Sequence, residues 1–225
     1  MTMKKLGLVT IGQAPRMDVG PIFQKYVGGR AEIMQAGVLD GMTKAEAEAA
    51  FSPEKGDYVL TSKLVTGESV VMSREKIAPV LQRRLHELEA AGCDPIVVLC
   101  TGTFEGLATN NALLIEPDVI LRSTLSAMLK NKRLGVIVPL LEQQDALEDE
   151  WGSLVDAVYA AASPYAEGET ELIRAAKELA DQNVDAILMD CMGYVEASKA
   201  VVEAYANLPV ILSNALLAKI VSELY

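Results

Sequence analysis

Short apolar runs rich in β-branched residues alternate along the chain with longer segments whose apolar positions recur at helical spacing. Several runs lack polar alternation, which is typical of strands covered on both faces of a parallel sheet. The pattern therefore predicts βα units. The expected strands are residues 6–11, 31–38, 96–100, 134–138, 154–159, 187–190 and 210–212. The expected helices are residues 21–27, 44–51, 75–91, 104–111, 124–130, 142–151, 170–182, 195–205 and 215–224, with Asp18 and Ser73 as N-caps.

One register relates two stretches of the chain. Residues 96–102 and 187–193 are both apolar runs that end in Cys, one further residue and Gly, and Cys100 and Cys191 are 91 positions apart (191 − 100 = 91). Val-Ile-Leu at 119–121 recurs at 210–212 with the same offset (210 − 119 = 91). We expect a repeat in which these tripeptides are matched strands and the two thiols occupy the same structural point.

The first half of the repeat contains an insertion. Residues 5–9 resemble residues 133–137 at an offset of 128 (135 − 7 = 128), which exceeds the other offset by 37. The insertion is assigned to residues 43–73. This segment has a short helical pattern followed by a β-hairpin pattern, with strands at 58–64 and 68–72 around the turn at 65–67.

Composition excludes several classes of function. The chain has 225 residues, 51% of them hydrophobic, and a formal net charge of −11, which disfavours nucleic-acid binding. No apolar run reaches the length of a membrane span, and the first residues read as a strand rather than a signal peptide. Three cysteines are an odd number and too few for a disulfide scaffold, which indicates reduced thiols in a cytoplasmic protein. The single histidine, His86, is expected at the surface, Cys93 is expected to be structural, and no metal-ligand spacing is present.

Each of the two matched cysteines is expected at the carboxyl end of a parallel strand, just before a helix. Ligands of open α/β sheets bind at this edge, where the N–H groups of a following helix stabilise a thiolate or an enolate. If Cys100 and Cys191 face one cleft, one removes a proton as thiolate and the other returns a proton to the opposite face as thiol. This reaction needs no metal or cofactor. One cysteine ending a buried strand is usually a packing residue, but the shared register favours catalysis for the pair.

Further residues are candidates for binding a substrate near the thiols. The candidate donors to a developing oxyanion are Thr101, Thr103, Asn214 and the backbone at Gly102 and Gly193. The side chains of Met192 and Tyr194 indicate a partly apolar ligand. Asp190 either orients Cys191 or acts as a base, although strand alternation points it away from its neighbour.

The loop after the first strand has two interpretations. In one, Thr10, Gly12 and Gln13 lie against a ligand and Arg16 clamps a carboxylate. In the other, the loop is a tight turn with a surface arginine. The residues alone favour neither.

Taken together, four motifs resemble the AroM family over nearly the full length: residues 8–16, 134–139, 189–193 and 209–215. More distantly, the paired cysteines resemble the aspartate/glutamate racemase superfamily, which includes hydantoin racemases, maleate isomerases and arylmalonate decarboxylases. This resemblance implies an α/β fold of two pseudo-symmetric Rossmann-like lobes, with parallel sheets facing a central cleft and one catalytic cysteine per lobe. It further implies a first lobe of residues 1–116 plus 209–225, with the insertion at 43–73, and a second lobe of residues 117–208.

The chain departs from the amino-acid racemases of that group. Those enzymes usually have Asn-Thr after the first cysteine and Thr after the second, where this chain has Thr101-Gly102 and Met192-Gly193. They also tend to carry an acidic residue and serine where this chain has Gly12-Gln13, so aspartate and glutamate are not the expected substrates.

The leading hypothesis is a cofactor-independent racemase or epimerase that acts on a small carboxylate or cyclic amide. The alternatives are a cysteine-dependent decarboxylase or cis–trans isomerase, and a non-catalytic small-molecule binding or regulatory protein. The expected partner is a small molecule rather than nucleic acid or membrane, and a homodimer is the default for this size and class.

Overall fold

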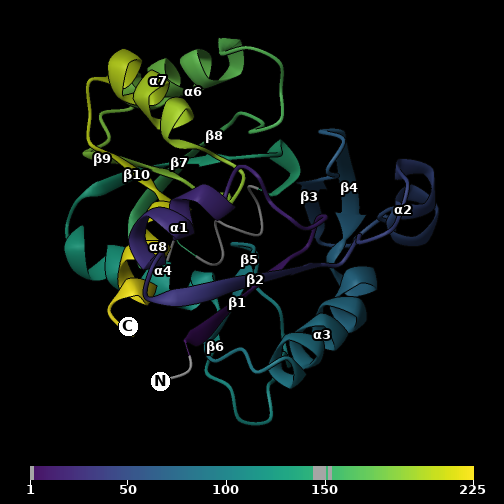
Figure 1. Ribbon diagram of the computed structural model, residues 1–225. Coiled ribbons are helices and arrows are strands. Elements are labelled where there is room, and N and C mark those ends of the chain that lie inside the picture. Colours follow the sequence, from purple (N-terminus) through teal and green to yellow (C-terminus); the bar gives the residue numbers. More distant parts are fainter. Residues whose placement is uncertain (1–2, 144–150, 152–153) are drawn as a thin grey trace. The chain divides into compact units, whose positions relative to one another are not determined.

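The computed structural model describes residues 3–143, 151 and 154–225 (Figure 1). The chain divides into two units, Met1–Asp118 with Leu217–Tyr225, and Val119–Leu216. The first unit contains β1 (Lys4–Thr10), α1 (Gly20–Val27), β2 (Ala31–Gly37), α2 (Lys44–Phe51), β3 (Val59–Lys63), β4 (Ser69–Ser73), α3 (Arg74–Ala90), β5 (Ile96–Leu99) and β6 (Leu114–Ile115). The rest of the chain contains α4 (Pro117–Met128), β7 (Arg133–Val138), the 3-10 helix η1 (Leu141–Gln143), β8 (Asp156–Ala161), α6 (Thr170–Asp181), β9 (Ala186–Met189), α7 (Glu196–Ala206), β10 (Val210–Leu212) and α8 (Ser213–Ser222).

Each unit is built on a parallel four-stranded sheet. The first sheet has the strand order β2-β1-β5-β6. The second sheet has the equivalent order β8-β7-β9-β10. In both, the second strand along the chain flanks the first, and the third and fourth follow on the other side. The prediction of an α/β protein with two parallel sheets is confirmed, and the pseudo-symmetric arrangement of the two units stays a prediction.

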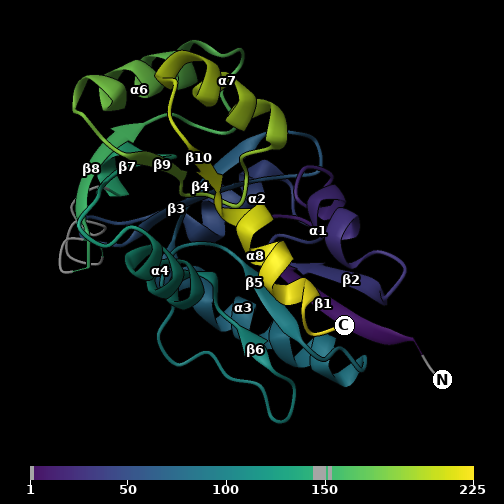
Figure 2. The same cartoon turned by 90° about the vertical axis from the view of Figure 1, so that its left-hand side faces the viewer.

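Helices cover both faces of the second sheet. Leu134, Val136 and Val138 of β7 pack with Leu125 of α4 in one apolar cluster. The intervening Gly135 lies on the opposite face, where a Cβ would meet the Leu179 side chain of α6 at 3.1 Å. Figures 1 and 2 show α6 beside α7 over this sheet. Burial on both faces explains why the strands lack polar alternation.

The predicted hairpin is confirmed, and its status as an insertion stays a prediction. Strands β3 and β4 pair antiparallel from Val59–Ser73 to Lys63–Ser69. The Ser73 side chain accepts a hydrogen bond from the Lys76 N–H, so Ser73 is the N-cap of α3 as predicted. In the second unit, residues 162–169 connect β8 directly to α6 and contain no strand.

The repeat register does not continue beyond the cysteines. Residues 104–111 are not the predicted helix, because Gly106 adopts φ +77 and the Glu89 carboxylate holds the backbone N–H groups of residues 110–112. Residues 119–121 are not a strand but part of α4, which begins at Pro117 and carries an acidic residue in its first turn. The counterpart of β10 is instead the two-residue strand β6.

The division into units differs from the expected one at the C-terminal strand. Strand β10 hydrogen-bonds with β9, so residues 210–212 belong to the second sheet rather than the first lobe. Only Leu217–Tyr225 group with the first unit, where Lys219 lies over the Tyr26 ring of α1 at 5.6 Å.

Smaller differences affect element ends. The strand expected at 154–159 is β8, two residues later, and the helix expected at 124–130 is the end of α4. The helix expected at 142–151 lies largely outside the described residues, apart from Trp151 and the last residues of η1.

Asp18 is not an N-cap, because α1 follows Val19 without a side-chain cap. Within the described residues, none of the helices has the length and apolar content needed to cross a membrane.

Asn207 provides a test of the end of α7. It closes the helix in the left-handed conformation, with φ 53 and ψ 40. We expect Asn207→Gly to change the free energy of unfolding by only a few tenths of a kcal/mol, because glycine adopts this conformation readily. Asn207→Val should cost about 1–2 kcal/mol, because a β-branched residue is strained there. Urea unfolding measures both changes.

The matched control is Asn111→Val, at an exposed asparagine outside the positive-φ residues of the described chain. An equal cost at both positions would contradict the explanation by backbone strain.

Candidate functional site

The predicted site residues form two groups, one at the carboxyl edge of each sheet. In the first unit, Cys100 follows β5 directly and is 7% exposed. Thr10 ends the neighbouring strand β1, where it pairs in register with Leu99. The first loop and the first cysteine are therefore adjacent, as ligand-binding loops of parallel sheets are.

Gly102 allows the inserted hairpin to approach Cys100. A Cβ on Gly102 would lie 2.9 Å from Leu60 Cδ2, 3.6 Å from Cys100 Sγ and 3.7 Å from Tyr58 Cε1. A larger residue would collide with Leu60. The hairpin therefore supplies apolar side chains immediately beside the first thiol.

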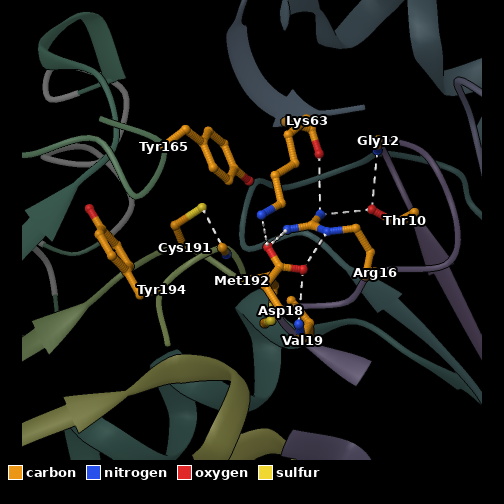
Figure 3. Close-up of polar contacts among 12 residues, drawn as sticks. Thr10, Gly12, Arg16, Asp18, Val19, Lys63, Tyr165, Cys191, Met192 and Tyr194 are labelled. Carbon is orange, nitrogen blue, oxygen red and sulfur yellow. Dashed lines mark hydrogen bonds and ion pairs between the residues drawn. The ribbon is translucent and has the colours of Figure 1, made fainter. Parts of the chain in front are cut away.

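Arg16 is a buried ion-pair partner. Its Nε and Nη2 donate to Oδ1 and Oδ2 of Asp18, each at 2.9 Å, and this fork is visible in Figure 3. Its Nη1 donates to Thr10 Oγ1 at 3.0 Å and to Ser62 Oγ at 3.2 Å. Arg16 is 3% exposed, so it is not the surface arginine of the second interpretation. The carboxylate that it clamps belongs to the chain itself.

Lys63 of the hairpin completes this charged cluster. Its Nζ lies 3.1 Å from Asp18 Oδ2 (Figure 3). Burial alone would raise the pKa of Asp18, but the hydrogen bonds and positive charges of Arg16 and Lys63 lower it to about 2. Asp18 is thus held in its charged form by two cations, Arg16 and Lys63.

Gln13 and Gly12 have structural contacts within the first unit. The Gln13 amide donates to the carbonyl oxygens of Leu39 and Met42 and accepts from the Val65 N–H. Gly12 is buried, and a Cβ there would lie 2.3 Å from Ser62 Oγ. Both residues fasten the first loop to its neighbours, and their contact with a ligand stays a prediction.

The Arg74 side chain of α3 holds the residues that follow Cys100. Arg74 donates to the backbone and side-chain oxygens of Thr103 at 3.3 and 3.4 Å, and its guanidinium stacks 4.4 Å from the Tyr58 ring centroid. Thr101 and Gly102 are half-buried between these anchors. The Cys100 loop therefore has a defined shape.

In the second unit, the backbone and a tyrosine surround Cys191. The Gly193 N–H donates to Cys191 Sγ at 3.4 Å, which stabilises negative charge on the sulfur (Figure 3). A Cβ on Gly193 would lie 2.6 Å from Tyr165 Oη. Only glycine lets the Tyr165 ring lie this close to the cysteine loop.

Asn214 and Tyr194 hold the Cys191 loop in place. The Asn214 amide donates to the carbonyl oxygens of Met192 and Tyr194 at 3.0 and 2.7 Å, and Ser213 Oγ donates to the Cys191 carbonyl oxygen. The Tyr194 hydroxyl donates to the Ala162 carbonyl oxygen, and burial raises its pKa well above the ordinary value. Met192 is 2% exposed. These contacts are those of positioning residues rather than of open binding groups.

The remaining thiol and the histidine lie elsewhere. Cys93 is 1% exposed, and burial raises the pKa of its thiol, which disfavours the thiolate. His86 is exposed on α3. Asp190 is buried, and its N–H donates to the Ile137 carbonyl oxygen.

Five side chains that contribute to the two groups were not predicted as site residues: Tyr58, Leu60, Ser62, Lys63 and Tyr165. The first four lie on the inserted hairpin and the last in a loop between β8 and α6. An acidic residue two positions from Arg16 is a signal for an ion pair, although the local pattern predicts Asp18 as an N-cap.

Comparison with known proteins places this arrangement in context. The family model described as AroM protein matches residues 6–225. No curated protein matches the sequence. Among solved structures, a glutamate racemase from Bacillus anthracis has a TM-score of 0.67 at 14% identity, over 100% of this chain and 82% of that one. A glutamate racemase from Aquifex pyrophilus has a TM-score of 0.61 at 17% identity, over 98% and 84%.

Other similar structures carry different activities in their names. The maleate isomerase from Pseudomonas putida has a TM-score of 0.59 at 16% identity, over 99% of this chain and 92% of that one. Unliganded arylmalonate decarboxylase has a TM-score of 0.59 at 12% identity, over 98% and 91%. At these identities the likeness establishes the fold alone, which this chain shares with these proteins.

The Asp18 ion pair predicts how stability changes with pH. The pKa of Asp18 is about 2 in the folded protein and 3.8 as an isolated group, so the charged form favours folding. This contribution, about 2 kcal/mol, is fully present above about pH 4 and is lost as the pH falls toward 2. We expect Asp18→Asn to lower the free energy of unfolding by at least this amount near neutral pH, and the difference from the natural protein to shrink through that window.

Urea unfolding of both proteins across this pH range measures the effect, with Asp181→Asn at an exposed helix position as the control. A difference that is independent of pH would contradict the ion-pair explanation.

Proposed function

The chain belongs to the AroM family, and we propose that it is a cofactor-independent isomerase of the racemase or epimerase type. Its substrate is a small carboxylate or cyclic amide, and its acid/base pair is Cys100 and Cys191. The other site residues position these thiols or bind the substrate. The proposal concerns the activity of this chain and goes beyond the fold that it shares with its structural neighbours.

One observation carries the proposal: the two cysteines occupy the same topological position. Cys100 follows β5 and Cys191 lies two residues after β9, and each of these strands is the third of its sheet. Each cysteine is followed after one residue by a glycine that a neighbouring side chain approaches closely, Gly102 by Leu60 and Gly193 by Tyr165. A packing role for the thiols gives no reason for this correspondence.

The proposed reaction consists of two proton transfers. The thiolate of one cysteine takes the proton from the carbon next to the carbonyl group, which forms an S–H bond and breaks the C–H bond. The electron pair of that bond moves into the carbonyl group as an enolate. The thiol of the other cysteine then gives its proton to the opposite face of the carbon and becomes a thiolate. The reverse reaction exchanges the two roles.

The described contacts support these roles. The N–H of Gly193 is aimed at Cys191 Sγ and stabilises the thiolate form. On the side of the first unit, Arg16 donates to Thr10 at the end of β1, the strand beside that of Cys100. A cationic side chain at this edge of the sheet favours an anionic substrate.

The structural neighbours support the chemical class. Their names describe racemisation of glutamate, isomerisation of maleate and decarboxylation of an arylmalonate, which all involve small carboxylates. The replacement of the amino-acid racemase residues by Gly12-Gln13, Thr101-Gly102 and Met192-Gly193 argues against glutamate and aspartate for this chain.

Proton exchange in D₂O tests the proposal. The protein is incubated with chiral carboxylic acids, amino acids and hydantoins, and NMR follows the α-proton of each. We expect exchange with at least one class of compound. Either Cys100→Ala or Cys191→Ala should slow it by about 10²-fold or more, because each removes a general acid/base.

Cys93→Ala is the matched control, since it removes a buried thiol that lies outside both groups of site residues. It should keep the exchange rate of the natural protein. Exchange that survives the loss of Cys100 or of Cys191, or its absence across the whole panel, would refute the two-thiol mechanism. Release of CO₂ or conversion of a double bond without exchange would favour a decarboxylase or a cis–trans isomerase instead.

A further inference from the structure

The first residues of α8 hold the Cys191 loop by three of its carbonyl oxygens. Ser213 Oγ donates to the carbonyl oxygen of Cys191 at 3.2 Å. The Nδ2 group of Asn214 donates to the carbonyl oxygens of Met192 and Tyr194 at 3.0 and 2.7 Å. Both side chains are fully buried, so water does not compete for these hydrogen bonds.

The partners of the Asn214 amide fix its orientation. Both are carbonyl oxygens, which can only accept, so Nδ2 faces them and Oδ1 lies on the other side of the amide. Within the part of the chain that the structure describes, this Oδ1 is buried and has no hydrogen-bond partner. An unpaired buried acceptor costs free energy, so the favourable contribution of this amide comes from its two donors.

One of the two donors acts on the peptide group that contacts the thiol. The carbonyl of Met192 and the N–H of Gly193 belong to the same peptide group, which is planar and trans. Its C=O and N–H therefore point in opposite directions. Asn214 holds the carbonyl end at 3.0 Å, and the N–H end donates to Cys191 Sγ at 3.4 Å. The side-chain amide, the peptide group and the sulfur thus form one chain of hydrogen bonds.

We infer that Asn214 is a positioning residue that sets the reactivity of Cys191 through the peptide group between Met192 and Gly193. Its hydrogen bond keeps the Gly193 N–H aimed at Sγ. It also polarises the peptide group, which strengthens donation to a thiolate. For catalysis the inference rests on the proposed function, because it takes Cys191 to be one of the two acid/base groups.

Ser213 provides a contrast on the same loop. The carbonyl that it holds belongs to the peptide group between Cys191 and Met192, whose N–H is that of Met192 and not that of Gly193. Loss of Ser213 Oγ therefore removes an anchor of the loop without releasing the peptide group that faces the sulfur. A difference between Ser213 and Asn214 variants reports on that peptide group rather than on anchoring alone.

The pH profile of Cys191 alkylation tests the inference. Iodoacetamide reacts with the thiolate, and mass spectrometry of the Cys191 peptide gives the rate at each pH. We expect Asn214→Leu, which has a similar volume but no donor, to raise the pH of half-maximal rate by about one unit. Ser213→Ala should keep the midpoint of the natural protein. A midpoint that Asn214→Leu leaves unchanged, or that Ser213→Ala shifts equally, would overturn the inference.

Other titratable groups of the second unit lie around this loop. They include Asp190 and Tyr194 of the loop itself, Tyr165, and Glu171 of α6, and their charges act on one another. Both variants retain all four groups. A change in these charges therefore does not account for a difference between the two variants.

A measurement on the natural protein decides the matter if Asn214→Leu fails to fold, since Asn214 is fully buried. NMR follows the backbone amide of Gly193 and the side-chain amide of Asn214 over the pH range in which Cys191 ionises. We expect both signals to move with the midpoint of Cys191 alkylation, and Cys191→Ser to remove the step from both. A step at Gly193 without one at Asn214 would contradict the inference.

The outcomes separate this inference from the proposed function. A midpoint shift in Asn214→Leu without α-proton exchange on any compound would refute the two-thiol mechanism and support the role of Asn214. Exchange that requires both cysteines, with no midpoint shift in Asn214→Leu, would support the mechanism and overturn the role of Asn214.

Discussion

The buried ion pair between Arg16 and Asp18 holds the first unit's site together. A guanidinium that is nearly removed from water requires a carboxylate close by, because an unpaired buried charge costs several kcal/mol. The same guanidinium donates to Thr10 at the end of β1 and to Ser62 on β3. The first loop, the strand end and the hairpin therefore share one electrostatic constraint, and a change in any of them affects the others.

A second constraint is the edge of a parallel sheet. All carboxyl ends of the strands in such a sheet lie along one edge, so residues far apart in sequence meet there. Thr10 and Cys100 come together in this way because β1 and β5 are neighbours in register. Cys191 lies two residues beyond the end of β9, at the equivalent edge of the second sheet.

The two thiols are supported by different means. The surroundings of Cys100 include Tyr58 and Leu60 of the inserted hairpin, which lie close to Gly102. The loop of Cys191 is held by the Asn214 and Ser213 side chains at the start of α8 and by the N–H of Gly193. The two cysteine loops thus share a topological position but not a supporting structure.

The sequence by itself determined the α/β class, the hairpin, the cap at Ser73 and the position of both cysteines at strand ends. These features are local, since periodicity and turn residues act over a few positions. Tertiary structure alone decided that Val-Ile-Leu at 119–121 is helical while the same tripeptide at 210–212 is a strand that pairs with β9. It also decided the distant partners of the ion pair, because Arg16 donates to Ser62, 46 positions away in sequence, and Asp18 pairs with Lys63 of the same hairpin. The Asp18 carboxylate is local to Arg16, but which distant side chains join the pair depends on how separate segments pack, and no local pattern encodes that.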